Sequence, residues 1–308
     1  MTGAHSNADV WQAPAPPELP AMAPDTLARR YALNRGAIED AALAAERADD
    51  TEQAGALRAL AAPDRRFLSF DGRGRAVEVL GDLATARTVT VLVPGADTTL
   101  RHFDTHGSAW AAPGGGARAL DAQLRRDDPH GHHAVVAWLG YRTPETIGGA
   151  VITPGRAEDG AGSLRAFLGE LRSAAPRARA NLLCHSYGSV VCASAAHGLD
   201  VTDIAFYGSP GSGVTTASGL HTAARIWAGR ASGDGISRVP HVSIQLPFDI
   251  TLGLGADPMS PSFGARRFAT GTGGHGDYLR PGSTSLHNLA RIALGRAEAV
   301  TPEGARRA

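Results

Sequence analysis

The stretch C-H-S-Y-G at positions 184–188 has the residue types of a serine nucleophile held in a sharp turn. An apolar run at 180–185 predicts a strand before Ser186, and the small residues of 189–197 predict a helix after it. Small residues two positions before and after the serine let strand and helix approach closely, as in the G-x-S-x-G nucleophile elbow. Gly188 fits this pattern, and Cys184 replaces the first glycine with another small residue. The sequence therefore predicts an exposed nucleophile at Ser186, and the alternative is an ordinary serine in a tight turn.

An elbow serine needs a base and an orienting acid, and the later part of the chain offers both in the expected order. Asp234 is the first acidic residue after the predicted strand 225–228, and His275 lies in a glycine-rich loop after 265–269. Ligands bind beyond the carboxyl ends of parallel strands, where both residues fall. We therefore expect His275 to take the proton of Ser186 Oγ, and Asp234 to fix the tautomer of His275.

Other acids and histidines compete for these roles. Asp257, in G-A-D-P-M, is a rival acid or a turn cap, and Asp249 is a weaker rival. His287 falls within the closing helix, where packing or exposure is expected, and the side chain of His185 is expected to point away from the nucleophile. No His, Cys and Asp set has metal-ligand spacing, so we expect no metal ion. The remaining histidines of interest are expected to be solvated in a polar loop region: His102, His106, His130, His132 and His133.

Acyl transfer also needs two backbone N–H groups that point at the developing oxyanion. Tyr187 follows the nucleophile and is expected to supply one of them. Ala96, after the strand-like V-L-V-P-G, is expected to supply the other, with Gly95 permitting the turn. The alternative is a plain turn at the end of a strand.

Apolar runs alternate with helical patterns along most of the chain. Strands are predicted at 88–93, 134–139, 180–185, 203–207, 225–228 and 265–269, and helices at 161–172, 189–197 and 286–294. Such alternation is typical of a mostly parallel sheet with helices on both faces. Asp71-Gly72 between two alternating runs predicts a hairpin.

The chain ends and the long connections complete the predicted organisation. Residues 1–24 are rich in Ala and Pro and predict a flexible arm, 25–62 predict a helical extension, and 63–308 the main domain. The connection 209–224 is too short for a large inserted lid. Two long segments, 97–131 and 235–264, are expected to be loops that roof the site, or in the second case a strand covering the sheet. Gly114-Gly115-Gly116 is placed in the first loop, and Tyr141 and Tyr187 face either the site or the core.

Composition narrows the class of protein. The formal net charge is zero, so nothing directs the chain to nucleic acid or to an anionic membrane. No apolar run is long enough to span a bilayer, and no signal peptide is recognisable, which favours a cytoplasmic protein. The two cysteines cannot build a disulfide framework and are expected to be buried small hydrophobic residues. No G-x-G-x-x-G follows a first strand, which argues against a dehydrogenase.

From about Phe67 onward the chain resembles the α/β-hydrolase fold. It resembles more closely a family of α/β hydrolases from high-GC bacteria that was long catalogued as a domain of unknown function. The resemblance is carried by P-D-R-R-F-L-S-F-D, V-L-V-P-G, A-W-L-G-Y, C-H-S-Y-G-S, F-Y-G-S-P-G and G-H-G-D-Y-L. It implies a serine hydrolase with Ser186, Asp234 and His275 at the triad positions, and it implies no particular substrate. Family members usually have Gly where this chain has Cys184, a difference that concerns turn geometry.

These observations together predict a cofactor-independent serine hydrolase that acts on a small-molecule ester or thioester through an acyl-enzyme. An acyltransferase or cyclase would use the same acyl-enzyme with another acceptor. A hydrolase-like protein that only binds its ligand is the non-enzymatic alternative, and an incomplete triad would favour it.

Overall fold

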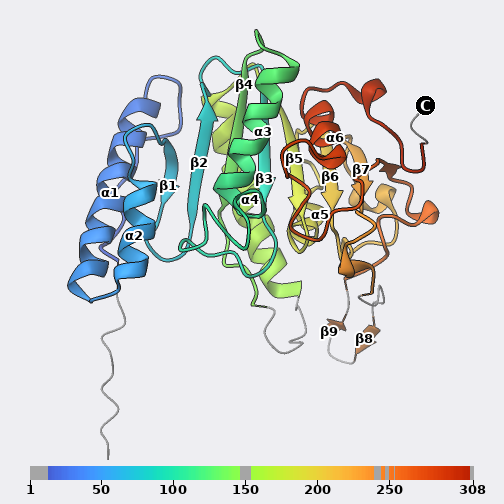
Figure 1. The fold of residues 1–308 in the computed structure, drawn as a ribbon, viewed down its shortest axis with the longest axis horizontal. Helices are drawn as coiled ribbons and strands as arrows, with labels where there is room; N and C mark the ends of the chain where they lie inside the picture. The colour runs from blue at the N-terminus through green and yellow to red at the C-terminus, as the bar shows by residue number, and fades with distance from the viewer. Residues whose placement is uncertain (1–12, 146–153, 239–243, 247–249, 253, 306–308) are drawn as a thin grey trace, which may run out of the picture.

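The computed structural model describes residues 13–145, 154–238, 244–246, 250–252 and 254–305. Its centre is an eight-stranded sheet (Figure 1) with the strand order β1-β2-β4-β3-β5-β6-β7-β10. Six neighbouring strands run parallel, namely β4, β3, β5, β6, β7 and β10, whereas β1 and β2 are antiparallel to their neighbours. The prediction of a mostly parallel sheet is therefore confirmed. The bounds of the eight strands of this sheet are β1 Phe67–Phe70, β2 Ala76–Gly81, β3 Thr88–Val93, β4 His133–Leu139, β5 Arg179–His185, β6 Asp203–Tyr207, β7 Arg225–Gly229 and β10 Arg266–Arg267.

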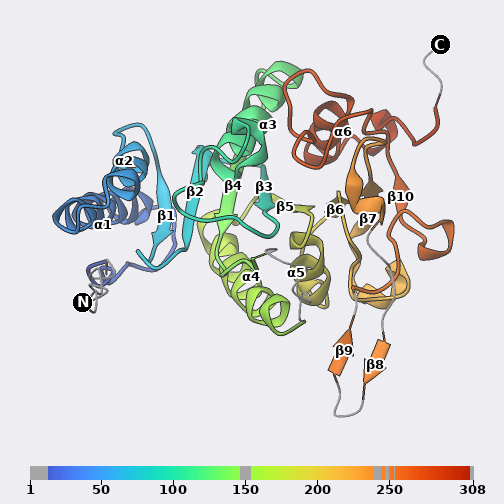
Figure 2. The same ribbon diagram turned by 60° about the horizontal axis from the view of Figure 1, so that its bottom comes forward.

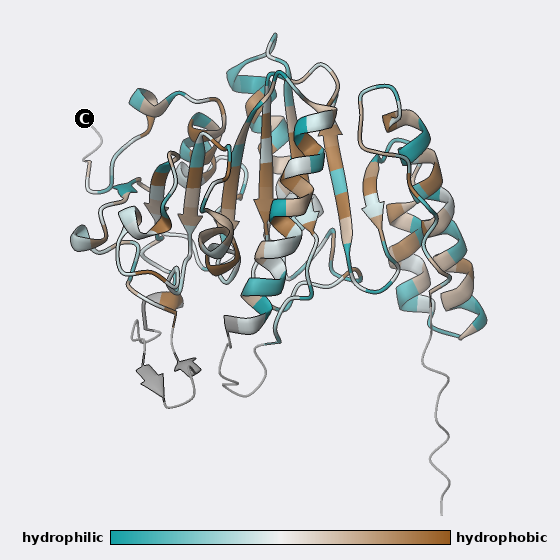
Figure 3. Cartoon of the chain, turned by 180° about the vertical axis from the view of Figure 1, so that it is seen from behind, coloured by the Kyte–Doolittle hydropathy of each residue, from teal (hydrophilic) through white to brown (hydrophobic). Residues whose placement is uncertain are grey.

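Helices cover both faces of this sheet (Figure 2). α4 (Pro154–Ala174) and α5 (Gly188–Ala195) pack on one face, and α3 (Pro113–Asp127) and α6 (Thr284–Ala293) pack on the other. The strands alternate accordingly: Val91 and Val93 of β3 belong to the α4–α5 core, whereas Leu92 belongs to the opposite core. The central strands are hydrophobic along most of their length, whereas outward helix faces carry the hydrophilic residues (Figure 3).

The predicted helical extension forms two helices at the β1 edge of the sheet, α1 (Leu27–Arg47) and α2 (Thr51–Leu60). Arg30 Nε donates to Leu68 O at 2.7 Å and Asn34 Nδ2 to Phe67 O at 2.9 Å, so buried polar side chains fix α1 along β1. Of the predicted arm, residues 1–12 lie outside the described part of the chain. Met22, which is described, is buried against the core.

One predicted loop is wrong: residues 113–127 form α3, and Gly114-Gly115-Gly116 is its first turn. Three glycines are poor helix formers, so local sequence argues against a helix. Close tertiary contacts explain why glycine occupies these three positions, because a larger side chain would not fit. A Cβ at Gly114 would lie 2.5 Å from Asp104 Oδ1, one at Gly115 2.0 Å from Ala109 O, and one at Gly116 2.7 Å from Leu279 Cδ1.

The later connections differ less from expectation. The predicted strand 265–269 contains only β10, and the connection from β6 to β7 holds one short 3-10 turn (Ala217–Leu220) and no lid. In the segment 235–264, β8 (Ile244–Leu246) and β9 (Ile250–Leu252) pair with each other as a separate hairpin below the sheet in Figure 1. Within the described ranges, no helix combines the length and apolar character needed to cross a bilayer.

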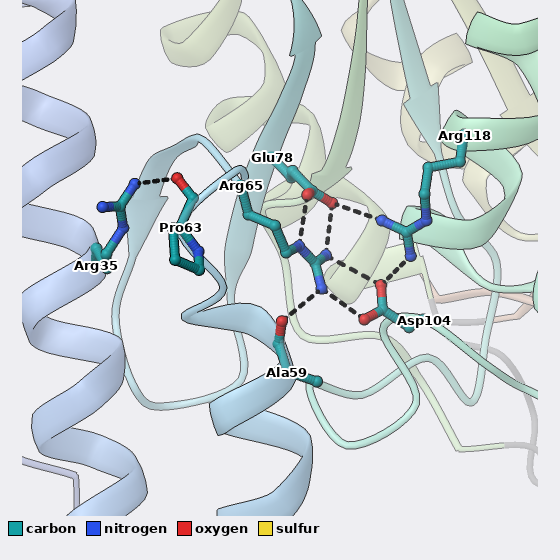
Figure 4. A network of polar contacts seen from close by, with 7 residues as sticks. All are labelled: Arg35, Ala59, Pro63, Arg65, Glu78, Asp104 and Arg118. Carbon is teal, nitrogen blue, oxygen red and sulfur yellow. Dashed lines mark hydrogen bonds and ion pairs between the residues drawn. The ribbon is translucent and has the colours of Figure 1, made fainter.

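A network of ion pairs, buried at Arg65 and Glu78, joins the N-terminal helices to the sheet and to α3 (Figure 4). Arg65 bonds Glu78 through two contacts of 2.7 Å and Asp104 at 2.6 and 3.0 Å, and it donates to Ala59 O at 3.2 Å. Arg118 of α3 pairs with the same two carboxylates. Burial raises the pKa of Asp104, but the bonds from Arg65 and Arg118 outweigh it and hold the pKa below its ordinary value. The network anchors the segment 104–118, which lies beside the candidate site.

Arg65→Met is expected to lower the free energy of unfolding at pH 7 by about 3 kcal/mol, because it leaves the buried Glu78 carboxylate and the part-buried Asp104 carboxylate with Arg118 alone. Since the pKa of Asp104 is depressed, its contribution is present above the unfolded pKa and is lost as pH falls through the folded value. The difference between wild type and variant should therefore shrink in acid. Urea unfolding at several pH values measures this.

Arg35→Met is the matched control, since the bond described for Arg35 is a single exposed one, to Pro63 O at 2.7 Å (Figure 4). It should cost about 1 kcal/mol or less. Equal losses in the two variants would contradict a special role for the network.

Candidate active site

Ser186 sits at a strained strand-to-helix turn between β5 and α5. Its φ is 52°, and its N–H donates to Tyr207 O at 3.0 Å. A Cβ at Gly188 would lie 2.5 Å from Val93 O, and one at Gly95 would lie 2.6 Å from Ser186 Cβ. The turn therefore needs glycine at both positions, because α5 and the end of β3 press against it. A non-glycine residue at positive φ in such a turn is the geometry of a nucleophile elbow.

The structure brings Ser186, His275 and Asp234 together, although His275 is 89 residues from Ser186 in sequence. His275 Nε2 lies 2.9 Å from Ser186 Oγ, and His275 Nδ1 lies 3.0 Å from each Asp234 oxygen. With the proton on Nδ1, Nε2 is free to accept the serine proton. The Asp234 side chain is fully buried, whereas that of His275 is 39% exposed. This arrangement can activate a serine at a surface that solvent reaches.

Asp234 is held by more groups than the sequence indicated. The Ile236 N–H donates to Oδ1 at 2.9 Å, and the Tyr278 hydroxyl donates to Oδ2 at 2.6 Å. Burial raises the pKa of Asp234, but the hydrogen bonds from His275, Tyr278 and Ile236 outweigh burial and keep the pKa below its ordinary value. Asp234 is therefore charged at neutral pH and can stabilise an imidazolium on His275.

The His185 side chain, expected to point away from Ser186, packs against His275, a contact that the sequence did not indicate. The two ring centroids are 4.7 Å apart, and His185 Nε2 donates to the backbone oxygen of His275 at 2.8 Å. The elbow lifts Ser186 out of the strand, but His185 is still in β5, on the face against which the His275 loop packs. Burial, with the nearby His275, lowers the pKa of His185 to about 3, so it is a neutral donor.

The rival residues lie elsewhere. Asp257 pairs with Arg230 at 2.8 Å and accepts from the Met259 N–H at 2.9 Å, and Asp249 lies outside the described residues. His287 is a half-buried residue of α6. Of the histidines expected to be solvated, His130 and His132 are exposed and His102 contacts Thr99. Burial of the His133 side chain beside Asp128 contradicts that expectation.

A cavity of about 520 Å³ opens beside Ser186 and His275. Gly95, Ala96 and Tyr187, the predicted oxyanion-hole residues, line it. The Tyr187 side chain is buried, and burial raises its pKa to about 12. The hydroxyl of Tyr141 donates to Pro94 O at 2.7 Å and so supports, from the core, the turn that precedes Gly95 and Ala96.

Most of the cavity roof comes from the first of the two long segments. His106 and residues 110–113 line the cavity, whereas the second segment contributes Ile236 among its described residues. Trp110 Nε1 donates to Asp277 Oδ1 at 3.1 Å, and Asp277 Oδ2 accepts from the Gly274 N–H at 2.9 Å. The roof is thus tied to the His275 loop, a link that no sequence pattern indicated.

A disulfide joins Cys184 to Cys192, which corrects the expectation of two separate buried thiols. Cys184 is the second-last residue of β5, before Ser186, and Cys192 lies on α5 after it. The elbow folds the helix back onto the strand, so two cysteines eight positions apart meet in the core. Disulfides are rare in cytosolic proteins, so this bond weighs against the cytoplasmic location that composition favours.

Reduction of this disulfide is expected to destabilise the fold by about 2–3 kcal/mol, the chain-entropy value for so short a loop. Urea unfolding with and without a phosphine reductant measures the change. A Cys192→Ala variant has no bond to reduce, so its unfolding midpoint should not respond to the reductant. An equal response in both proteins would contradict the prediction.

The family model for α/β hydrolases matches residues 71–244. An uncharacterized protein of Mycobacterium tuberculosis, Rv2079, is 28% identical over an alignment of 276 residues that covers 77% of this chain and 39% of that protein. An uncharacterized protein of Mycobacterium bovis, Mb0988c, is 31% identical over 187 residues, covering 56% of this chain and 69% of that protein. The chain therefore spans well under half the length of the first relative.

Two solved structures are among those that the comparison matches to this chain. That of esterase PE8 covers 72% of this chain and 99% of its own at 14% identity, with a TM-score of 0.47. That of XC6422 from Xanthomonas campestris, described as a serine hydrolase without lid, covers 78% and 98% at 16% identity, with a TM-score of 0.45. Because the family model spans more than half of the chain, the protein belongs to the α/β hydrolase family.

Proposed function

We propose that the protein is a serine hydrolase that cleaves an ester or thioester through an acyl-enzyme on Ser186. The observation that carries the proposal is the continuous hydrogen-bonded path from Ser186 through His275 to Asp234 at the wall of the cavity. Its spacing of 2.9 and 3.0 Å suits proton transfer between a nucleophile and its base.

The proposed reaction has two halves. Ser186 Oγ attacks the carbonyl carbon while His275 Nε2 takes the hydroxyl proton, and the N–H groups of Tyr187 and Ala96 bind the oxyanion. The bond to the leaving group then breaks, and His275 returns the proton to that group. Water next gives a proton to His275 and attacks the acyl-enzyme. Collapse of the second intermediate frees the acid and restores Ser186.

The cavity favours an uncharged acyl group. Its lining includes Leu92, Pro94, Trp110, Pro210 and Leu279, and its volume of about 520 Å³ is that of a small-molecule site. Exposure of the His275 side chain gives water access to the second half-reaction, which favours hydrolysis over transfer to another acceptor. The complete set of three hydrogen-bonded residues argues against a protein that only binds its ligand.

Labelling with a fluorophosphonate probe tests the proposal. The wild-type protein should be labelled on Ser186, located by peptide mass spectrometry, and Ser186→Ala should not be labelled. A panel of p-nitrophenyl esters of rising chain length should give saturable hydrolysis. A folded wild-type protein that takes up no probe, or takes it up at another residue, would refute the proposal.

A further inference from the structure

We propose that Tyr278 is a positioning residue that orients the Asp234 carboxylate toward His275, an inference that rests on the proposed function. The Tyr278 hydroxyl donates to Asp234 Oδ2 at 2.6 Å and accepts from the Ala231 N–H at 3.1 Å. A phenol has one proton to donate, and the Ala231 N–H occupies an acceptor position. The hydroxyl proton is therefore directed at the carboxylate.

The carboxylate has a fixed partner on each oxygen. Oδ1 accepts from the Ile236 N–H and Oδ2 from Tyr278, and His275 Nδ1 lies 3.0 Å from both. Without Tyr278, Oδ2 would lose the shortest of the hydrogen bonds described for this carboxylate, and the carboxylate would be freer to rotate. Rotation would break the contact that keeps His275 in the tautomer able to accept a proton.

The Tyr278 ring is itself held tightly. It is buried, and its centroid lies 5.3 Å from the ring of Tyr207 and 5.8 Å from that of His185. A Cβ at Gly208 would lie 2.9 Å from Tyr278 Cε2 and 3.1 Å from Asp234 Oδ2, so a glycine there lets the backbone rest against both groups. The hydroxyl thus has little freedom to leave the carboxylate.

The chain places Tyr278 three residues after His275, within one loop. The Gly274 N–H donates to Asp277 Oδ2, and the Asp277 N–H donates to Gly274 O at 3.1 Å, which closes this loop as a compact turn. One segment therefore carries the base and the residue that orients the acid. Any shift of the loop moves both together, which keeps their relative geometry.

The contact also sets the strength of the base. Burial, followed by the Asp234 carboxylate, raises the pKa of Tyr278, so it stays a neutral donor. Its bond withdraws charge from Asp234, and loss of the bond leaves more negative charge facing His275. Other groups near His275 are Ser186, Tyr207 behind His185, and His185, which is neutral because burial lowers its pKa to about 3. Asp97 and His106 line the same cavity, and Asp277 lies in the same loop and bonds Trp110 and the Gly274 N–H. Asp234 is the charged group through which Tyr278 acts, so removing the hydroxyl should strengthen the attraction between this carboxylate and a protonated imidazole.

Tyr278→Phe tests the inference, with Tyr207→Phe as the matched control that removes a buried phenol oxygen from the adjacent ring. The rate of fluorophosphonate labelling is measured from pH 5 to 9, which needs no knowledge of the natural substrate. In Tyr278→Phe the plateau rate should fall about 10-fold, and the acid limb should move to higher pH. In Tyr207→Phe the acid limb should stay at the wild-type pH.

An acid limb of Tyr278→Phe that coincides with wild type, or the same shift in Tyr207→Phe, would overturn the role of Tyr278. Labelling on Ser186 in these variants would still support the proposed function. Absence of labelling in the wild type would overturn that function and this inference with it.

Discussion

Ser186→Ala is expected to lower kcat for ester hydrolysis by about 10⁵-fold or more, the scale seen when a serine nucleophile is removed. Alanine keeps the elbow backbone but supplies no oxygen to form the acyl-enzyme. The residual rate would come from oxyanion binding and substrate orientation alone. The measurement is steady-state hydrolysis of the best ester in the chain-length panel.

Ser189→Ala is the matched control. Ser189 lies three residues further along, is fully buried, and donates from Oγ to Cys184 O at 3.2 Å. Its loss should change stability modestly and leave kcat within a few-fold of wild type. A Ser186→Ala protein that keeps more than about a hundredth of the wild-type kcat would contradict a nucleophilic role.

Asp234→Asn is expected to reduce kcat by about 10⁴-fold at neutral pH. An asparagine has nearly the same shape, but its amide can donate to Nδ1 and so favours the tautomer in which Nε2 carries the proton. It also offers no negative charge to an imidazolium. The buried position and the Tyr278 and Ile236 contacts leave little room for another acceptor to take its place.

Asp257→Asn is the control that separates the two candidate acids. Asp257 pairs with Arg230 at 2.8 Å, a contact outside the Ser186–His275 path. Its substitution should change kcat by no more than a few-fold. A large loss in Asp257→Asn with a small loss in Asp234→Asn would reverse the assignment.

Periodic local patterns explain why the fold was predictable from the sequence. The strands β3, β4, β5, β6 and β7 coincide with predicted apolar runs to within a residue or two. A buried strand of a parallel sheet needs a continuous apolar segment, and a tight turn between strand and helix needs small residues. Each of these features can therefore be recognised from a short stretch of sequence. The order of Ser186, Asp234 and His275 along these strand ends also follows from topology, because parallel strands end on one edge.

The surroundings of these three residues were decided by tertiary contacts. From sequence alone, the three glycines of α3 predict a loop. The structure explains them, because Asp104, Ala109 and Leu279 occupy the space that a larger side chain would need. Likewise, nothing in the local pattern pairs Cys184 with Cys192, directs His185 onto His275, or joins Trp110 to Asp277 across 167 residues.

The sequence by itself therefore determined the sheet, its layers and the candidate nucleophile, acid and base, since each depends on residue type at a position within one element. Only the tertiary structure decided how the Asp234 carboxylate is held, how the roof is anchored and how the elbow is braced. Those features depend on pairs of residues far apart in sequence, and which pairs meet is set by how whole elements pack.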